Sequence, residues 1–179
     1  DLCAVIGRET NGFFSSTYAG QLDPTGLVKG WAIQRASELL GAAGSSSHCV
    51  NGGGDMQVVG EPQPGDAWQV GIIHPLHPGE LASVVSIRDG AVATSGTAER
   101  GAHVLDPFTG RPAETLASVT VVGSELIRVD AYATAALAMG HAARNWLESC
   151  PGYEAFAVGA DGFGWWTSGY PRVGSVPVG

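Results

Sequence analysis

The chain has 179 residues, of which 44% are hydrophobic, and a mean hydropathy of +0.10, which is enough for one globular domain with a core. Its 17 acidic residues against 9 Lys and Arg give a net charge of −8. This balance excludes the long basic surface that binds duplex nucleic acid. The apolar runs are far shorter than the roughly 20 residues of a membrane span, so we expect no span.

The cysteines and the first residue limit two further conclusions. Cys3, Cys49 and Cys150 have no metal-like spacing and are odd in number, so we expect buried small apolar side chains rather than a disulfide framework. The chain opens on Asp1, so any signal peptide or lipid-attachment site would lie upstream. Localisation, cytoplasmic or exported, stays open.

The first half of the chain predicts one helix followed by short strands. Apolar residues recur at helical spacing over Leu27–Ala43, and Gly44 follows them. Five apolar segments then predict strands, at His48–Asn51, Met56–Val59, Trp68–His74, Ala82–Arg88 and Ala91–Thr94. Asp89-Gly90 predicts a hairpin between the last two.

The second half predicts a strand, a long helix and a closing hairpin. The strand is Ala117–Val122, and Ser124 caps an Ala-rich helix from Glu125 to about Trp146. Tyr153–Gly159 and Phe163–Thr167 form the hairpin, and we expect its Phe163-Gly164-Trp165-Trp166 segment in the core or at a sheet edge. This order predicts a single α+β domain over residues 1–179, with mixed or antiparallel β-sheets and two main helices.

The start of the first predicted helix is a candidate anion site. The segment from Asp23 to Gly30 places a turn containing Gly26 before the helix and Lys29 in its first turn. Backbone N–H groups and the helix dipole attract anions there, and the Lys adds a charge suited to phosphate. An ordinary helix start on a solvated face is the alternative.

Two loops between predicted strands carry further candidates. Asn51-Gly52-Gly53-Gly54-Asp55 marks a place where the backbone approaches a ligand closely or forms a wide hairpin loop oriented by Asp55. Thr94-Ser95-Gly96-Thr97 leads into the segment from His103 to Pro112, which gathers hydroxyl, imidazole and charged groups. Functional loops often lie in such places, although a lone His is more often structural.

The long helix carries a candidate metal site. Asp130 and Thr134 are spaced i, i+4 and share one face in a largely apolar run. A carboxylate there needs a partner, and Mg²⁺ prefers oxygen ligands while phosphates and waters complete its octahedron. A capped or water-bound Asp at a helix edge is the alternative.

These segments, in this order, resemble the ApbE-type flavin transferases. The matching motifs are Asp-Pro-x-Gly-x-x-Lys-Gly, Asn-x-Gly-Gly-Asp, Thr-Ser-Gly followed by Glu-Arg, His-x-x-Asp-Pro-x-Thr-Gly-x-Pro, and Asp-Ala-x-Ala-Thr-Ala. The similarity starts at Thr10 and continues more weakly into the terminal hairpin. The family's N-terminal segment, with its Met-Gly-Thr stretch, is not found in this sequence, so the resemblance implies an N-terminally incomplete catalytic domain.

The resemblance implies Mg²⁺-dependent transfer of FMN from FAD to a Thr or Ser hydroxyl of an acceptor flavoprotein, which leaves a phosphoester bond and releases AMP. It implies that Asp130, Thr134 and the Gly26 carbonyl hold the magnesium ion. It implies that His103 takes the proton of the acceptor hydroxyl. The residues expected to contact FAD are Phe13, Phe14, Ser15, Asp23, Lys29, Gly53, Asp55, Thr94, Ser95 and Val104. We do not expect the Phe163-Gly164-Trp165-Trp166 segment to stack on the flavin.

Two other functions remain open at this point. One is a relative that binds or hydrolyses FAD without modifying a protein. The other is a structural domain that binds phosphate.

Overall fold

The computed structural model describes residues 2–18, 21–22, 24–97 and 104–175. The helices in these ranges are α1 (Leu2–Glu9), α2 (Thr25–Ala42), α3 (Leu126–Met139) and α4 (Ala143–Glu148), with 3₁₀ turns at Gly140–Ala142 and Tyr170–Arg172. The strands are β1 (Thr17–Tyr18), β2 (Gln21–Leu22), β3 (His48–Gly52), β4 (Asp55–Val59), β5 (Trp68–Ile73), β6 (Leu81–Ile87), β7 (Gly90–Gly96), β8 (Leu116–Gly123), β9 (Glu154–Gly159) and β10 (Gly164–Trp166).

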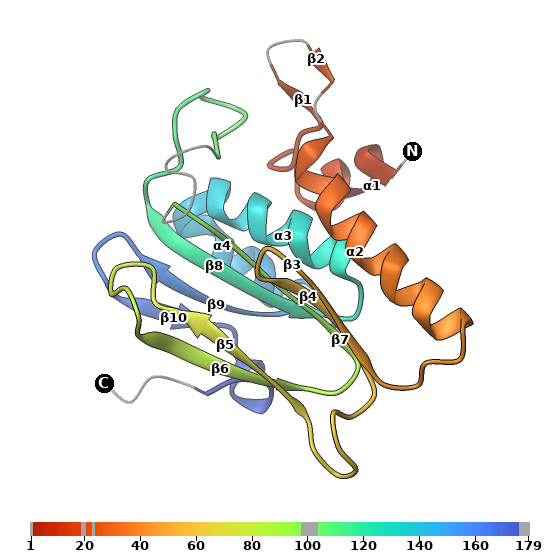
Figure 1. The fold of residues 1–179 in the computed structure, drawn as a ribbon. Helices are drawn as coiled ribbons and strands as arrows, with labels where there is room; N and C mark the ends of the chain where they lie inside the picture. Colours follow the sequence, from red (N-terminus) through yellow and green to blue (C-terminus); the bar gives the residue numbers. More distant parts are fainter. Residues whose placement is uncertain (1, 19–20, 23, 98–103, 176–179) are drawn as a thin grey trace.

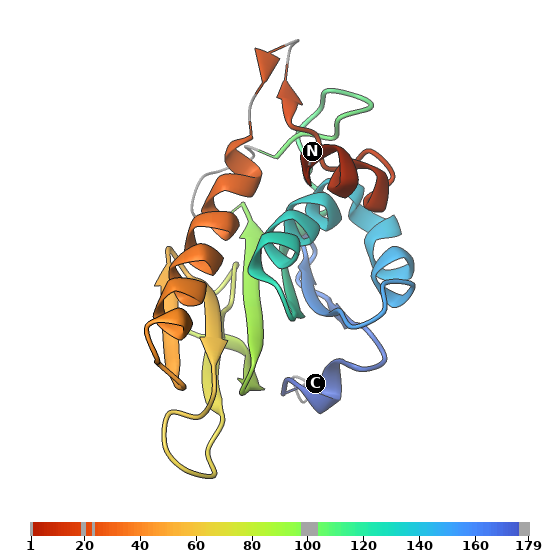
Figure 2. The same ribbon diagram turned by 90° about the vertical axis from the view of Figure 1, so that its right-hand side faces the viewer.

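Helices, a sheet and a two-stranded ribbon form three layers (Figure 1). The described part of the sheet has the strand order β10-β9-β8-β7-β4-β3, with every neighbouring pair antiparallel. The helices cover one face, as the turned view in Figure 2 shows. The ribbon, in which β5 pairs with β6, covers the other face.

The central strands are buried on both faces, because the helices cover one face and the ribbon covers the other. Ala91 and Ala93 of β7 pack toward α3, and Val92 between them packs against the ribbon. On β9, Ala157 faces the helices and Phe156 faces the ribbon. Successive strand side chains point to opposite faces, so one strand supplies both cores. The Ala residues on the helix side let α3 approach the sheet closely.

The predicted fold class is confirmed. The structure is α+β, its sheets are antiparallel, and α2 and α3 are its two longest helices. The strands predicted between residues 48 and 94 correspond to β3 to β7, and the predicted closing hairpin is β9 paired with β10. No helix in the described ranges has the length and apolar character needed to cross a bilayer.

The predicted hairpin at Asp89-Gly90 is wrong. β6 pairs with β5 in the ribbon, whereas β7 pairs with β4 and β8 in the sheet, so the turn carries the chain from one layer to the other. Gly90 has a φ of 149°, and a Cβ there would lie 2.6 Å from the Gly123 carbonyl oxygen. The dipeptide therefore carries the chain between layers at a point where the backbone of Gly90 lies close to that of Gly123.

The predicted long helix is interrupted and differently capped. α3 ends at Met139, Gly140 has a φ of 59°, and a 3₁₀ turn leads into α4. Ser124 is not the N-cap: Glu125 occupies that position and makes no side-chain capping bond.

Two glutamines from other elements cap α3 instead. Gln57 Oε1 accepts from Leu126 N at 3.0 Å, and Gln34 Oε1 accepts from Ile127 N at 3.1 Å. The helix start is therefore tied to β4 and α2, because these side chains satisfy N–H groups that lack partners within the helix.

Helix α1 was not predicted, and it is held by contacts from α3 and α4. Glu9 Oε2 accepts from Arg128 Nε at 3.3 Å and from Tyr132 Oη at 3.1 Å, while the Glu9 carbonyl accepts from Trp146 Nε1 at 3.2 Å. Eight residues form a marginal helix alone, so these long-range contacts supply what the local sequence does not.

Two expectations about burial have different outcomes. Cys49 is exposed rather than buried, whereas Cys150 is half-buried. Trp165 and Trp166 lie on the edge strand β10 and pack against the helix-side and ribbon-side cores respectively, as expected for a sheet edge. Phe163, in the turn before them, is 79% exposed, so the expectation is wrong for this residue.

Gly30 lies where α2 crosses α3. A Cβ at this position would lie 2.9 Å from the Leu126 carbonyl oxygen, 3.0 Å from Asp130 Cβ and 3.2 Å from Asp130 Oδ2. Since no side chain separates the helices here, the Gly30 N–H reaches Asp130 Oδ2 at 3.1 Å. The distance between the two helices depends on this glycine.

We predict that Gly30→Ala destabilises the protein although alanine favours helix. Overpacking at the crossing should leave Gly30→Ala about 2 kcal/mol less stable than Gly41→Ala in urea unfolding. Gly41 is the matched control, because it lies in the same helix and an added Cβ would meet nothing within 4 Å. Equal stability of the two variants would contradict a tight crossing.

Candidate functional site

A lysine and two buried carboxylates meet where α2, α3 and the start of β4 converge. Lys29 Nζ lies 2.5 Å from Asp55 Oδ2 and 3.6 Å from Asp130 Oδ1. Asp55 is 1% exposed and Asp130 is 4% exposed, whereas the Lys29 side chain is 38% exposed. The ammonium thus lies between the carboxylates at the edge of the protein interior. These three residues are called the Lys29 cluster below.

Asp55 is held toward the cluster by the neighbouring strand. Its Oδ1 accepts from the Thr94 N–H at 3.2 Å, and its buried Oδ2 makes no well-directed hydrogen bond and has the Lys29 ammonium as its ionic partner. The carboxylate therefore does not orient the glycine loop. That loop is an exposed hairpin turn, with φ values of 65° at Gly53 and 92° at Gly54.

The Asp130 carboxyl is less acidic than an exposed one. Its pKa is raised from 3.8 to about 6, first by burial and then by the nearby Asp55 carboxylate. The Lys29 ammonium and the Gly30 N–H act in the opposite direction. The cluster holds two acids and one base within a poorly solvated space, so one negative charge remains unbalanced when both acids are ionised.

Hydroxyl groups line the neighbouring part of α3 and β7. Thr134, one turn after Asp130, has its Oγ1 3.1 Å from Ser95 Oγ. Thr94 alternates with Ala93 and Ser95, and its side chain faces the ribbon, where its Oγ1 lies 2.8 Å from the buried Thr120 Oγ1. Thr94 therefore contributes to this region by its N–H and not by its hydroxyl. The structure therefore brings the side chains of Lys29, Asp55, Ser95, Asp130 and Thr134, together with the N–H of Thr94, to adjacent positions on four elements.

The aromatic pair before α2 divides between core and surface. Phe14 is 4% exposed and packs among apolar residues of α1, α2 and α3, and a Cβ on Gly26 would lie 3.4 Å from its ring. Phe13 is half-buried and contacts Phe108 edge to face, with ring centroids 4.9 Å apart. Ser15 is exposed, and its hydroxyl donates to the Thr17 carbonyl at 2.8 Å. Phe14 thus supports the helix start on which Lys29 lies.

The remaining predicted residues are only partly placed. Val104 is half-buried and packs against the core between sheet and helices. Asp23 and His103 lie outside the described residues.

Sequence reasoning missed three contributors to this region. Gln34 and Gln57 fix the start of α3, and the Gly30 N–H orients Asp130. Asp55 and Gln57 lie two residues apart on β4 and are both buried. Polar residues at two positions on the same inward face of a strand were the signal that could have pointed to Gln57. No pattern in the sequence gives the crossing at Gly30.

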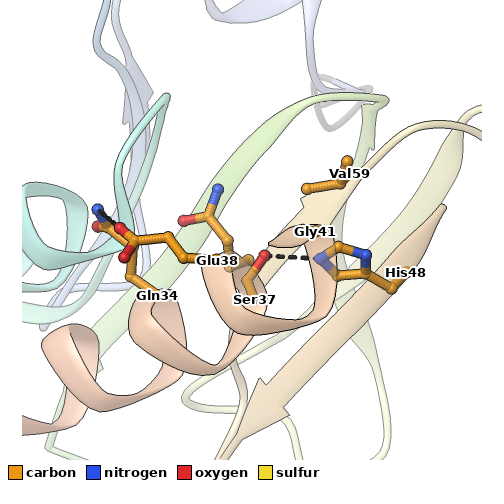
Figure 3. A pocket seen from close by; sticks show the side chains of 7 residues that line it. Gln34, Ser37, Glu38, Gly41, His48 and Val59 are labelled. Carbon is orange, nitrogen blue, oxygen red and sulfur yellow. Dashed lines mark hydrogen bonds between the residues drawn. The ribbon is translucent and has the colours of Figure 1, made fainter. Parts of the chain in front are cut away.

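A separate cavity of about 240 Å³ lies between α2 and the β3–β4 hairpin (Figure 3). It is lined by Gln34, Ser37, Glu38, Gly41, His48, Gln57 and Val59. Ser37 Oγ lies 2.8 Å from His48 Nε2, and Gln34 Nε2 donates to Glu38 Oε1 at 3.2 Å. Its polar groups are thus largely engaged with one another. None of the predicted site residues lines it.

The donors around Asp130 suit a hard cation. Carboxylate and hydroxyl oxygens are what Mg²⁺ prefers, and it takes few ligands from protein. The Asp55 oxygen without a directed hydrogen bond adds a further buried donor in the same place. In the described ranges no three His, Cys, Asp or Glu side chains gather as a metal site. A magnesium site here would therefore rely on hydroxyl, carbonyl and phosphate oxygens as well.

Comparison with known proteins identifies the family and the fold class of this chain. A sequence profile described as the ApbE family matches residues 5–157, so the chain belongs to the ApbE family. It is 37% identical over 135 residues to the FAD:protein FMN transferase of Rhodobacter capsulatus and 34% identical over 161 residues to that of Treponema pallidum.

The shares of each chain differ in these comparisons. The two alignments cover 70% and 79% of this chain but only 25% and 44% of the relatives. The crystal structure of an ApbE protein from Thermotoga maritima superposes with a TM-score of 0.87 at 21% identity. The superposition covers 96% of this chain and 75% of the Thermotoga maritima chain. The structural likeness carries the fold to this chain.

We predict that Asp130 makes metal-free stability depend on pH. The folded pKa of about 6 lies above the unfolded value of about 3.9, so the folded state binds more protons between these limits. This contribution to the free energy of unfolding is present below about pH 4 and is lost as pH rises through about 6. Asp130→Asn keeps an acceptor for the Gly30 N–H and cannot titrate.

The measurement is urea unfolding of both proteins in a chelator at several pH values. The stability difference should shift in favour of Asp130→Asn from about pH 4 to about pH 6. A difference that does not vary with pH would show that the Asp130 carboxyl is not perturbed by its burial.

Proposed function

We propose that this protein is an enzyme that transfers FMN from FAD to a Thr or Ser hydroxyl of an acceptor protein, with Mg²⁺ as cofactor. The observation that carries this proposal is the Lys29 cluster, in a chain of the ApbE family. The names of the two relatives describe transfer of FMN from FAD to protein. The Thr or Ser hydroxyl acceptor and the Mg²⁺ cofactor are not part of those names and belong to the proposal.

The cluster fits a pyrophosphate that brings a divalent cation. Asp130, Thr134 and the Gly26 carbonyl would hold the ion, and the unbalanced charge of the cluster favours it. When bound, magnesium neutralises charge on the phosphates and aligns the displacement. Lys29 reaches solvent from between the acids, so its ammonium can contact a phosphate oxygen while Asp55 holds the side chain in place.

The protein's other residues position the dinucleotide. The Gly30 N–H holds Asp130 Oδ2, and the Thr94 N–H holds Asp55, so both carboxylates have fixed orientations before any ligand arrives. Phe13 and Ser15 lie on the segment before α2 and would line the FAD site, together with Asp23 and Val104.

The proposed chemistry is a displacement at phosphorus. The acceptor oxygen forms a bond to the FMN phosphorus as the bond from that phosphorus to the bridging oxygen breaks, and AMP leaves with that oxygen. His103 takes the proton of the acceptor hydroxyl, a task suited to a group that titrates near neutrality.

The proposal is tested by incubating the protein with FAD, Mg²⁺ and an acceptor that carries the family's Asp-x-x-x-Ser/Thr-Gly-Ala-Thr-type sequence. Covalent flavin fluorescence on the denatured acceptor, with release of AMP, is expected. Chelation of Mg²⁺ should prevent both. Release of FMN and AMP without labelled acceptor would show an FAD hydrolase instead.

We predict that Asp130→Ala lowers transfer far more than it lowers stability, because Asp130 would supply the main protein charge on magnesium. Transfer rate and thermal unfolding midpoint are measured on the same preparation. Asp66→Ala, which removes an exposed carboxylate, is the control and should alter neither. Parallel losses of activity and melting temperature in Asp130→Ala would make Asp130 a structural partner.

We predict that His103→Ala still binds FAD and Mg²⁺ but transfers FMN roughly 10²–10⁴-fold more slowly, the usual contribution of a general base. The parent rate should rise with pH through an apparent pKa of about 6.5, and the variant should lose this dependence. His141→Ala, at an exposed position in the 3₁₀ turn before α4, is the control. Weak FAD binding with normal turnover at saturation would assign His103 to the pocket rather than to proton transfer.

A further inference from the structure

Phe108 is an exposed aromatic residue beside the segments that flank the candidate site. It is 66% exposed, although large apolar side chains are usually buried. Its ring meets Phe13 edge to face, with an interplanar angle of 72°. Gly12 lies beneath this contact, where an added Cβ would come within 3.2 Å of the Phe108 ring.

The loop that carries Phe108 is fixed by hydrogen bonds. Asp106 Oδ1 accepts from the Phe108 N–H and Asp106 Oδ2 accepts from Thr109 Oγ1, both at 2.9 Å. The Asp106 carbonyl accepts from Gly110 N at 2.8 Å, and Asp106 N donates to the Arg111 carbonyl at 2.8 Å. The Phe108 N–H is the main cause of a lowered pKa at Asp106. The ring is therefore presented by an ordered turn.

Contacts connect this aromatic pair to the start of α2. Phe13 is followed by Phe14, which packs against Gly26 in the first turn of the helix that carries Lys29. Figures 1 and 2 place the loop after residue 103, the end of α1 and the start of α2 at the same end of the molecule. A ligand bound at the Lys29 cluster would thus have an aromatic surface nearby.

We propose that Phe108, supported by Phe13, is a stacking surface for a planar ring system of the bound dinucleotide. The inference rests on the proposed function, which supplies FAD as the ligand. Aromatic heterocycles stack on exposed aromatic faces, and the contact excludes water from both. The edge-to-face contact with Phe13 fixes the Phe108 ring and leaves much of its surface open.

The test compares FAD binding by Phe108→Ala, Phe108→Leu and Phe163→Ala in the presence of Mg²⁺. Loss of the ring should weaken FAD binding by about tenfold in Phe108→Ala, with Phe108→Leu between it and the parent. Phe163→Ala is the matched control, because Phe163 is 79% exposed in the turn before β10. It should bind FAD as the parent does. Thermal unfolding midpoints verify that every variant is folded.

Binding of FMN and of ADP identifies the ring. If isoalloxazine stacks on Phe108, only FMN binding falls in Phe108→Ala, and Phe108→Trp quenches flavin fluorescence in the complex. If adenine stacks there, only ADP binding falls. Either result supports the inference.

Unchanged Kd values for FAD in folded Phe108 variants, with a parent that binds FAD, would overturn the stacking role and leave the proposed function standing. Slower transfer in those variants at an unchanged FAD Kd would assign Phe108 to the acceptor protein instead. A parent that binds no FAD would overturn the proposed function and this inference together.

Discussion

The ion pair of Lys29 with two buried carboxylates is the interaction on which the candidate site depends. Asp55 and Asp130 come from a strand and a helix far apart in the sequence, and two acids in a dry space repel each other. The ammonium between them offsets the repulsion between the two carboxylates. The position of α2 is thereby coupled to that of α3 and β4, because moving Lys29 away leaves two uncompensated charges.

The crossing at Gly30 and the two glutamines convert this electrostatic contact into a fixed geometry. Gly30 directly follows Lys29 and lets the two helices approach until the Gly30 N–H donates to Asp130. Gln34 and Gln57 then satisfy the first N–H groups of α3 from the same two neighbouring elements. Polar groups thus join α2, β4 and α3 at several points. Such shared satisfaction of buried groups makes the arrangement more specific than apolar packing alone.

The sequence predicted what local periodicity and motif spacing determine. Lys29 and Asp130 were recognised as candidates on predicted helices, Lys29 after a glycine turn and Asp130 in a largely apolar run. Asp55 was recognised after three glycines but was predicted in the loop, whereas it is the first residue of β4. The strands on either side of residues 89 and 90 belong to different layers, β6 to the ribbon and β7 to the sheet. A turn dipeptide does not reveal whether the chain folds back in one layer or crosses to another. The break at Gly140 depends on a left-handed φ beside the Thr115 side chain. The partners of Asp55 depend on contacts between distant residues, and a single sequence does not reveal them.

In the function proposed, a dinucleotide makes two opposite demands on its site. Its phosphates require fixed charges and N–H groups, which are most effective when partly shielded from water, and the Lys29 cluster lies at the edge of the interior. Its rings require apolar faces that water can leave, and Phe13 and Phe108 are the aromatic pair near the surface. Phe14 connects the two regions, because it is buried against the helix start while its neighbour Phe13 reaches outward. Two adjacent phenylalanines with opposite burial thus let one short segment support both the charged and the aromatic parts of the site.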